Sequence, residues 1–237
     1  MSSSVPSDDP RLISKDITYP GETEEIQAYY TRPKKNQKFP GVVVISEIWG
    51  LVPHIEDVTR RVALEGFIAL APDPLSPLGG TPEDAGEAVK MMRELDGDET
   101  TKNLIAAVEY LKTHPQSTGK VGVTGFCWGG GMTGAVAVNT PDVQAAVPFY
   151  GRQPALEDVP KIKASVLAHY AGEDERINAG IPDFKAALEK ASIEHEIYVY
   201  EGARHGFYND TRSIYNEEAS KLAWKRTIDF FKEKLGV

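Results

Sequence analysis

The residues best suited by type and spacing to carry out a reaction surround the only cysteine of the chain. Residues 125–131 read Gly-Phe-Cys-Trp-Gly-Gly-Gly, a G-x-C-x-G pattern between an expected strand (Lys120–Thr124) and an expected helix (Gly129–Asn139). In a nucleophile elbow of this kind, a strained turn lifts the nucleophile above the sheet, and glycines two residues before and after it avoid steric clashes. We therefore expect Cys127 to be a nucleophile, and we expect the N-terminus of the following helix to favour its thiolate form.

Two other interpretations of this turn remain open. A lone cysteine is often a small buried apolar residue, and a run of glycines can bind a phosphate. The turn is not followed by the lysine and Ser/Thr of a P-loop, and no G-x-G-x-x-G pattern begins here. One cysteine also rules out an intramolecular disulfide and a structural zinc site of several thiolates.

A thiol nucleophile needs a base and a group that orients the base. In this architecture the expected order along the chain is nucleophile, acid, histidine. Asp174 follows an expected strand (Ala164–Tyr170), and His205 follows another (His195–Tyr200). The carboxyl ends of parallel strands meet at one edge of a sheet, so we predict a triad of Cys127, His205 as the base and Asp174 as its orienting partner.

Other acidic residues and histidines could compete for these roles. Glu173 and Glu175 are the rivals of Asp174, and we expect both in solvent. The remaining histidines fall where structural roles are expected, namely the first turn of a helix, a helix end, the core of a strand and a strand start: His54, His114, His169 and His195.

Backbone N–H groups are expected to form an oxyanion hole above the thiol. One belongs to Trp128, next to the nucleophile, and the other to Ile48, in the loop after an expected strand (Gly41–Ser46). Four further residues near the expected active edge are candidates for contacts with the substrate: Trp49, Arg152, Phe207 and Tyr208.

Strands and helices alternate along the chain and must position these groups. This alternation predicts an α/β fold with a mostly parallel sheet and helices on both faces. We expect a single domain over residues 13–237, preceded by a flexible tail over residues 1–12. The other expected strands are Ile17–Tyr19, Ile26–Thr31, Phe67–Ala71 and Ala145–Phe149. The other expected helices are His54–Glu65, one capped by Thr81, Glu99–Thr113, Ile181–Ala191 and Asn216–Leu235.

The charge balance excludes several classes of partner. Lys and Arg number 26 and Asp and Glu number 35, a formal net charge of −9. This balance argues against binding of nucleic acid or of an anionic membrane surface. No apolar stretch is long enough for a membrane span, and the polar start (residues 1–10) lacks the features of a secretory signal, so we expect a cytoplasmic protein. A chain from which an export signal had been removed would look the same.

From about Ile17 onward the chain resembles the dienelactone hydrolase (carboxymethylenebutenolidase) family of the α/β-hydrolase fold. The segments that carry the resemblance are residues 46–51 (SEIWGL), 71–73 (APD), 125–130 (GFCWGG), 150–151 (YG), 172–174 (GED) and 205–207 (HGF). The resemblance implies hydrolysis of a small-molecule ester or lactone through an acyl-cysteine, without a metal or organic cofactor. It also implies that Glu47 lies beside the cysteine and takes part in forming the thiolate. A carboxylate directly after a buried strand is itself expected to have a perturbed pKa.

The sequence departs from this family where the substrate is concerned. Members that act on dienelactone carry arginines after the Pro72-Asp73 strand end and shortly after the histidine, whereas residues 74–81 and 206–211 contain none. Arg152, Arg176 and Arg204 are nearby arginines that could replace them, so a neutral ester or a different lactone remains open as substrate. Attack on phosphate triesters is also open.

Two other classes of function are weighed against hydrolysis. One is a redox-sensing thiol protein on the same fold, although the chain has no second cysteine to resolve an oxidised Cys127. The other is a non-catalytic relative that binds a ligand. We expect a monomer or a weak homo-oligomer.

Overall fold

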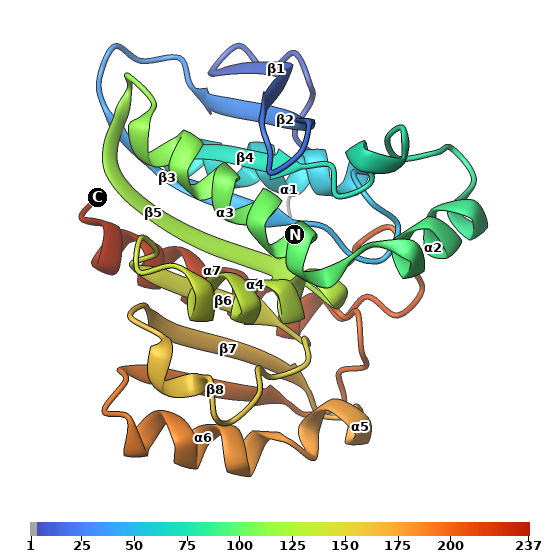
Figure 1. Ribbon diagram of the computed structural model, residues 1–237, viewed down its shortest axis with the longest axis vertical. Helices are drawn as coiled ribbons and strands as arrows, with labels where there is room; N and C mark the ends of the chain where they lie inside the picture. Colours follow the sequence, from blue (N-terminus) through green and yellow to red (C-terminus); the bar gives the residue numbers. More distant parts are fainter. Residues whose placement is uncertain (1–3) are drawn as a thin grey trace.

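The centre of the fold is an eight-stranded sheet in the order β1-β2-β4-β3-β5-β6-β7-β8 (Figure 1). The computed structural model describes residues 4–237. Strands β3 to β8 are parallel to one another, whereas β1 and β2 join antiparallel at the β4 edge. The strands are β1 (Leu12–Pro20), β2 (Glu25–Pro33), β3 (Phe39–Ile45), β4 (Ile68–Pro72), β5 (Ser117–Phe126), β6 (Ala145–Phe149), β7 (Ser165–Ala171) and β8 (His195–Tyr200). The predicted mostly parallel α/β fold is confirmed.

Helices cover both faces of this sheet because its central strands are apolar on both sides. In β3, Val42 and Val44 pack in one core cluster, and Val43 and Ile45 pack in the other. The first cluster includes α1 (Pro53–Leu64) and α7 (Glu217–Leu235), and the second includes α3 (Gly97–Thr113), α4 (Trp128–Asn139) and α6 (Ile181–Lys190). Alternating side chains of a strand point to opposite faces, so a continuous apolar strand requires this double cover.

The second helix begins later than predicted. The sequence suggested a cap at Thr81, but α2 (Ala85–Glu94) begins after Asp84, whose side chain accepts a hydrogen bond from Glu87 N. Thr81 instead donates its hydroxyl to Asp73 Oδ1 at 2.7 Å and accepts from Leu51 N at 2.9 Å. These partners remove Thr81 from the capping role, and they join the loop after β3 to the loop after β4 at the carboxyl edge of the sheet.

Within residues 4–12, the described part of the predicted flexible tail, the chain packs against α1. Residues 1–3 lie outside the described part of the chain. Val5 is buried against α1, where its N–H donates to Asp57 Oδ1 at 2.6 Å and its carbonyl accepts from Arg60 Nε at 2.8 Å. β1 then begins at Leu12. Asp57 and Arg60 of α1 therefore bind the backbone at Val5, in a segment whose polar composition had predicted a flexible tail.

Some short helical segments were not predicted from the sequence. They are α5 (Glu175–Asn178) and the 3₁₀ turns Ser76–Leu78 and Val159–Lys161. In residues 4–237, no helix is both long and apolar enough to cross a membrane.

Candidate active site

Cys127 stands on a sharp turn between β5 and α4. Its backbone has φ 55° and ψ −112°, in the left-handed region that L-residues avoid, and α4 begins at the next residue. Such strain persists only where the surroundings over-determine it. The turn lies beyond the carboxyl end of β5, at the edge of the sheet where ligands bind in open α/β folds.

Two glycines allow the chain to approach itself closely around this turn. A Cβ on Gly125 would lie 2.2 Å from the Gly129 carbonyl oxygen, and a Cβ on Gly129 would lie 2.3 Å from the Ser46 carbonyl oxygen. Both contacts are to backbone, which cannot move aside cheaply. The G-x-C-x-G spacing therefore brings the elbow against the end of β3, next to the loop that carries Glu47.

The structure brings Cys127, His205 and Asp174 together. His205 Nε2 lies 3.0 Å from Cys127 Sγ, and His205 Nδ1 lies 2.5 Å from Asp174 Oδ2. An ionised carboxylate only accepts hydrogen bonds, so Nδ1 carries the imidazole proton and Nε2 is free to accept one from the thiol. This is the geometry of a nucleophile with a base and an orienting acid.

Asp174 is held from its other side by the helix that it caps. Its Oδ1 accepts from Ile177 N at 3.3 Å, at the first turn of α5, and the side chain is buried. Glu173 and Glu175, which the sequence offered as alternatives to Asp174, are exposed. The remaining histidines occupy the structural positions expected for them. His169, for example, is fully buried with Thr227 and Tyr200 as ring partners.

A pocket of about 400 Å³ opens over the thiol. Ile48 and Trp128, whose N–H groups are the expected oxyanion donors, both lie in its wall. The wall is mostly apolar but carries the guanidinium groups of two arginines and one side-chain amide. The lining residues are Ile48, Cys127, Trp128, Gly131, Met132, Tyr150, Arg152, Gln153, Arg176, Ile177 and His205.

Only Arg152 of the four expected substrate contacts lines this pocket. Phe207 and Tyr208 are fully buried in an aromatic cluster, where the Tyr208 ring stacks on Phe126 with centroids 5.0 Å apart. Trp49 is covered by Arg212, whose guanidinium carbon lies 4.3 Å from the ring centroid. The expected substrate contacts of Phe207 and Tyr208 are therefore wrong. The aromatic residues after His205 anchor its loop in the core instead.

The pocket wall contains residues that the sequence did not single out. Gln153, Ile177 and Met132 are examples, and Arg176 was noted only as a substitute arginine. Ile177 and Arg176 belong to α5, which is too short to leave a periodic apolar pattern. The loop 74–81 contributes no residue to this lining.

Glu47 is a buried carboxylate beside the elbow. Its side chain follows β3 directly and is 3% exposed, and Oε2 accepts a hydrogen bond from Asn209 Nδ2 at 2.5 Å. Burial raises the pKa of Glu47, while the hydrogen bond from Asn209 and the electrostatic interactions with His54 and Arg212 oppose the rise. Burial outweighs these opposing contacts, so the pKa of Glu47 lies above its usual value, as is common for carboxyl groups at functional sites.

Burial also controls the thiol. It raises the pKa of Cys127 to about 11, and the negative charge of Glu47 adds to the rise, whereas a hydrogen bond from Trp128 N and the charge of Arg176 oppose it. The N-terminus of α4 favours the thiolate through the Trp128 N–H, as expected, but burial of the sulfur has the larger effect. Desolvation of the sulfur outweighs the backbone N–H groups around it.

The raised pKa leads to a test of thiol reactivity. Because only the thiolate is alkylated, labelling of Cys127 by iodoacetamide should fall about tenfold for each pH unit below 11. The Glu47→Gln variant removes a negative charge that disfavours the thiolate, so its profile should shift to lower pH. Mass spectrometry of the intact chain measures the rate at its one cysteine. Fast, pH-independent labelling between pH 6 and 8 in the wild type would contradict this account.

Comparison with known sequences shows the family of the chain. The profile of the dienelactone hydrolase family matches residues 26–235. The chain belongs to the dienelactone hydrolase family. A relative from Saccharolobus solfataricus is 34% identical over 93% of this chain and 98% of its own length, and one from Synechocystis is 33% identical over 92% and 96%. Both are named "putative carboxymethylenebutenolidase". The predicted enzyme class, a carboxylic ester or lactone hydrolase, is the class of this family.

Solved structures give the same relationship. A Klebsiella pneumoniae structure named "putative dienelactone hydrolase" superposes with a TM-score of 0.85 at 30% identity, covering 93% of this chain and 98% of that one. A dienelactone hydrolase-like promiscuous phosphotriesterase from metagenomic libraries also has a TM-score of 0.85, at 23% identity, with 94% and 99% coverage. The second likeness shows the shared fold alone.

Proposed function

We propose that this member of the dienelactone hydrolase family hydrolyses an ester or lactone with Cys127 as nucleophile, His205 as general base and Asp174 as the residue that orients His205. The observation that carries the proposal is the 3.0 Å separation of Cys127 Sγ and His205 Nε2, with Asp174 behind the imidazole and an open pocket above the sulfur.

The chemistry follows from these positions. The substrate carbonyl enters the pocket, the thiol proton passes to His205 Nε2, and the sulfur forms a bond to the carbonyl carbon. The N–H groups of Trp128 and Ile48 stabilise the oxyanion, each donor contributing about 3 kcal/mol. His205 then protonates the leaving alkoxide, and an acyl-cysteine remains. Water, deprotonated by His205, releases the acid and restores the thiol.

Glu47 acts on this sequence through its charge. While ionised, it disfavours the thiolate and keeps Cys127 protonated in the empty site. Any movement or protonation of Glu47 that accompanies substrate binding lowers the cost of forming the thiolate. We propose that the thiol is activated in this way when the pocket fills.

The same thiol pKa argues against the redox-sensor alternative. Sensor cysteines are exposed thiolates of low pKa. Cys127 is half-buried in the folded chain, and its pKa lies above that of a free thiol. A triad geometry around such a thiol fits acyl transfer, in which deprotonation accompanies attack.

The charge of the pocket indicates the kind of acyl group. Arg152 and Arg176 line it, at positions other than those at which the family resemblance leads one to expect arginines. Most of the remaining wall is apolar. We propose a substrate that carries a carboxylate beside its ester or lactone group, and a hydrolysis screen of anionic lactones against neutral aryl esters tests this choice.

The Arg152→Gln variant refines that screen. We expect KM for an anionic lactone to rise about 2- to 5-fold, the size of an exposed ion pair, with little change for a neutral aryl ester. Arg204→Gln is the matched control, because Arg204 is exposed near His205 but does not line the pocket. An equal effect of Arg152→Gln on both substrates, or no effect on either, would exclude a role in binding a carboxylate.

A further inference from the structure

The buried Glu47 carboxylate is held by a residue from a distant loop. Asn209, 162 positions later in the chain, donates its Nδ2–H to Glu47 Oε2 at 2.5 Å. Asn209 is 2% exposed and Glu47 3%, so water has little access to either group. A hydrogen bond to an ionised acceptor in such surroundings is strong and costly to lose.

The orientation of the Asn209 amide is determined by the hydrogen bonds that its Oδ1 accepts. Its Oδ1 accepts from Thr211 N at 3.1 Å and from Thr211 Oγ1 at 2.6 Å. Because both of these partners are donors, the oxygen must face Thr211, and the NH₂ group is left to face Glu47. Asn209 is therefore a fixed donor aimed at the carboxylate.

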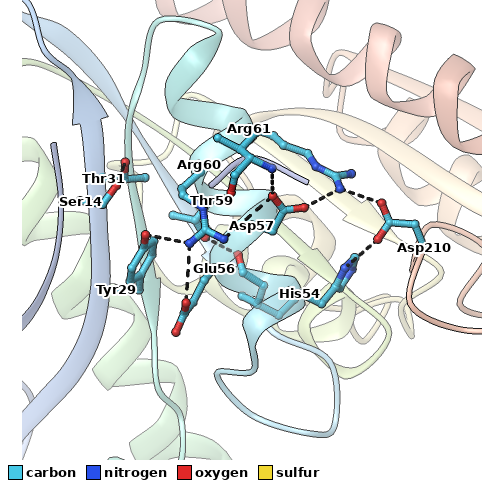
Figure 2. Close-up of polar contacts among 12 residues, drawn as sticks. Ser14, Tyr29, Thr31, His54, Glu56, Asp57, Thr59, Arg60, Arg61 and Asp210 are labelled. Atoms are coloured by element: carbon cyan, nitrogen blue, oxygen red, sulfur yellow. Dashed lines mark hydrogen bonds and ion pairs between the residues drawn. The ribbon is translucent and has the colours of Figure 1, made fainter. Parts of the chain in front are cut away.

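The next residue ties this loop to the helix that follows Glu47. Asp210 Oδ2 accepts from Arg61 Nη2 at 2.7 Å, and Asp210 Oδ1 lies 3.2 Å from His54 Nδ1 (Figure 2). Arg61 also pairs with Asp57 at 2.5 Å. The hydrogen bonds from His54 and Arg61 hold the pKa of Asp210 well below its usual range, so Asp210 stays charged. This cluster fixes the loop of Asn209 against α1.

We propose that Asn209 is a positioning residue that holds the Glu47 carboxylate, in its ionised form, beside Cys127. Through Glu47 it keeps the resting thiol protonated. The inference rests on the role proposed for Glu47 in the hydrolase. The charge state of Glu47 can nevertheless be measured without any turnover, so the two claims are tested separately.

Other titratable and charged groups interact with the Glu47 carboxylate and the Cys127 thiol, and a test of Asn209 must leave them unchanged. His54, Arg212 and His205 interact with Glu47 electrostatically, whereas Asn209 acts through a direct hydrogen bond. The groups that act on the thiol are Glu47, Arg176 and Asp174, with His205 in contact with the sulfur. A substitution at Asn209 leaves all of them in place.

The direct test is a carbon-13 NMR titration of glutamate side-chain carboxyls, with the Glu47 signal assigned from its loss in Glu47→Gln. In Asn209→Ala the ionised carboxylate loses its donor, so the pKa of Glu47 should rise. Thr211→Val is the matched control. It removes one contact to Asn209 Oδ1 but leaves the Nδ2 donor, and the pKa of Glu47 should stay at the wild-type value.

Turnover provides an independent arm. Because ionised Glu47 disfavours the thiolate, its earlier protonation in Asn209→Ala should raise kcat/KM, and the rate at which iodoacetamide labels Cys127, several-fold between the wild-type and the variant pKa of Glu47. In a Glu47→Gln background the same substitution should add no pH-dependent effect, whereas a merely structural role would still lower activity there.

The outcomes separate the two proposals. Asn209→Leu keeps nearly the size of the side chain and adds no charge but removes the donor, and it replaces Asn209→Ala if that variant does not fold. A Glu47 pKa unchanged in either folded variant, or shifted equally in Thr211→Val, overturns the positioning role. Ester turnover that does not need Cys127 overturns the proposed function, and leaves the titration result to decide the role of Asn209.

Discussion

The Cys127→Ala variant is expected to lose ester hydrolysis by roughly a thousandfold or more, because no acyl-sulfur intermediate can form. His205, Asp174 and the oxyanion donors remain, and they leave some residual rate enhancement. The fold should be preserved, since the substitution removes one sulfur atom from a half-buried side chain facing a pocket. Steady-state hydrolysis of an aryl ester measures the loss, and thermal unfolding confirms that the variant is folded.

Met132→Leu is the control for that experiment. Met132 lines the same pocket but has no titratable group, and leucine has nearly its volume. We expect its kcat/KM to stay within a few-fold of the wild type. Wild-type turnover in a folded Cys127→Ala protein would remove Cys127 from the mechanism.

Asp174→Asn is expected to lower kcat by roughly 100- to 10,000-fold while leaving the fold intact. The asparagine amide can donate to His205 Nδ1 and thereby place the imidazole proton on Nε2. In that tautomer Nε2 has no lone pair for the thiol proton, although its distance to Cys127 Sγ stays the same. The loss should therefore appear in kcat more than in KM.

Glu173→Gln is the matched control, a carboxylate-to-amide change one residue away on an exposed side chain. It should leave kcat unchanged. If Glu173→Gln and Asp174→Asn reduced kcat equally, the effect would reflect the charge of the loop and not the orientation of His205.

The elbow and its partners were open to prediction because their signals are local. A Cβ on Gly125 would lie within 2.5 Å of the backbone of the turn, and a Cβ on Gly129 within 2.5 Å of the backbone at Ser46, so both glycines are required and their spacing around Cys127 is visible in the sequence. Asp174 and His205 follow apolar strands whose ends meet at one edge of a parallel sheet. Chain order and topology were enough to bring them together.

The errors came from long-range contacts that composition does not reveal. Thr81 has the sequence of a helix cap, yet its hydroxyl binds Asp73. Val5 lies in a polar segment, yet Asp57 and Arg60 bind its backbone. Phe207 follows the catalytic candidate His205 but packs into the core, because the loop needs an apolar anchor.

Asn209 is a residue of the site whose long-range contact the sequence likewise does not reveal. Its only sequence signal is its place shortly after His205, where an arginine was sought, and an asparagine in a loop usually indicates a turn. Its bond to Glu47 links two positions that no local pattern connects. The resting state of the thiol escaped prediction for a related reason, since burial of Cys127 depends on all the loops around it.

The most direct measurement is a rapid-quench experiment with an activated aryl ester, followed by mass spectrometry of the digested protein. The account predicts a burst of alcohol release and an acyl group on the peptide that contains Cys127. An acyl group on a different residue, or a burst with no acyl group on Cys127, would contradict the central claim that this thiol is the nucleophile.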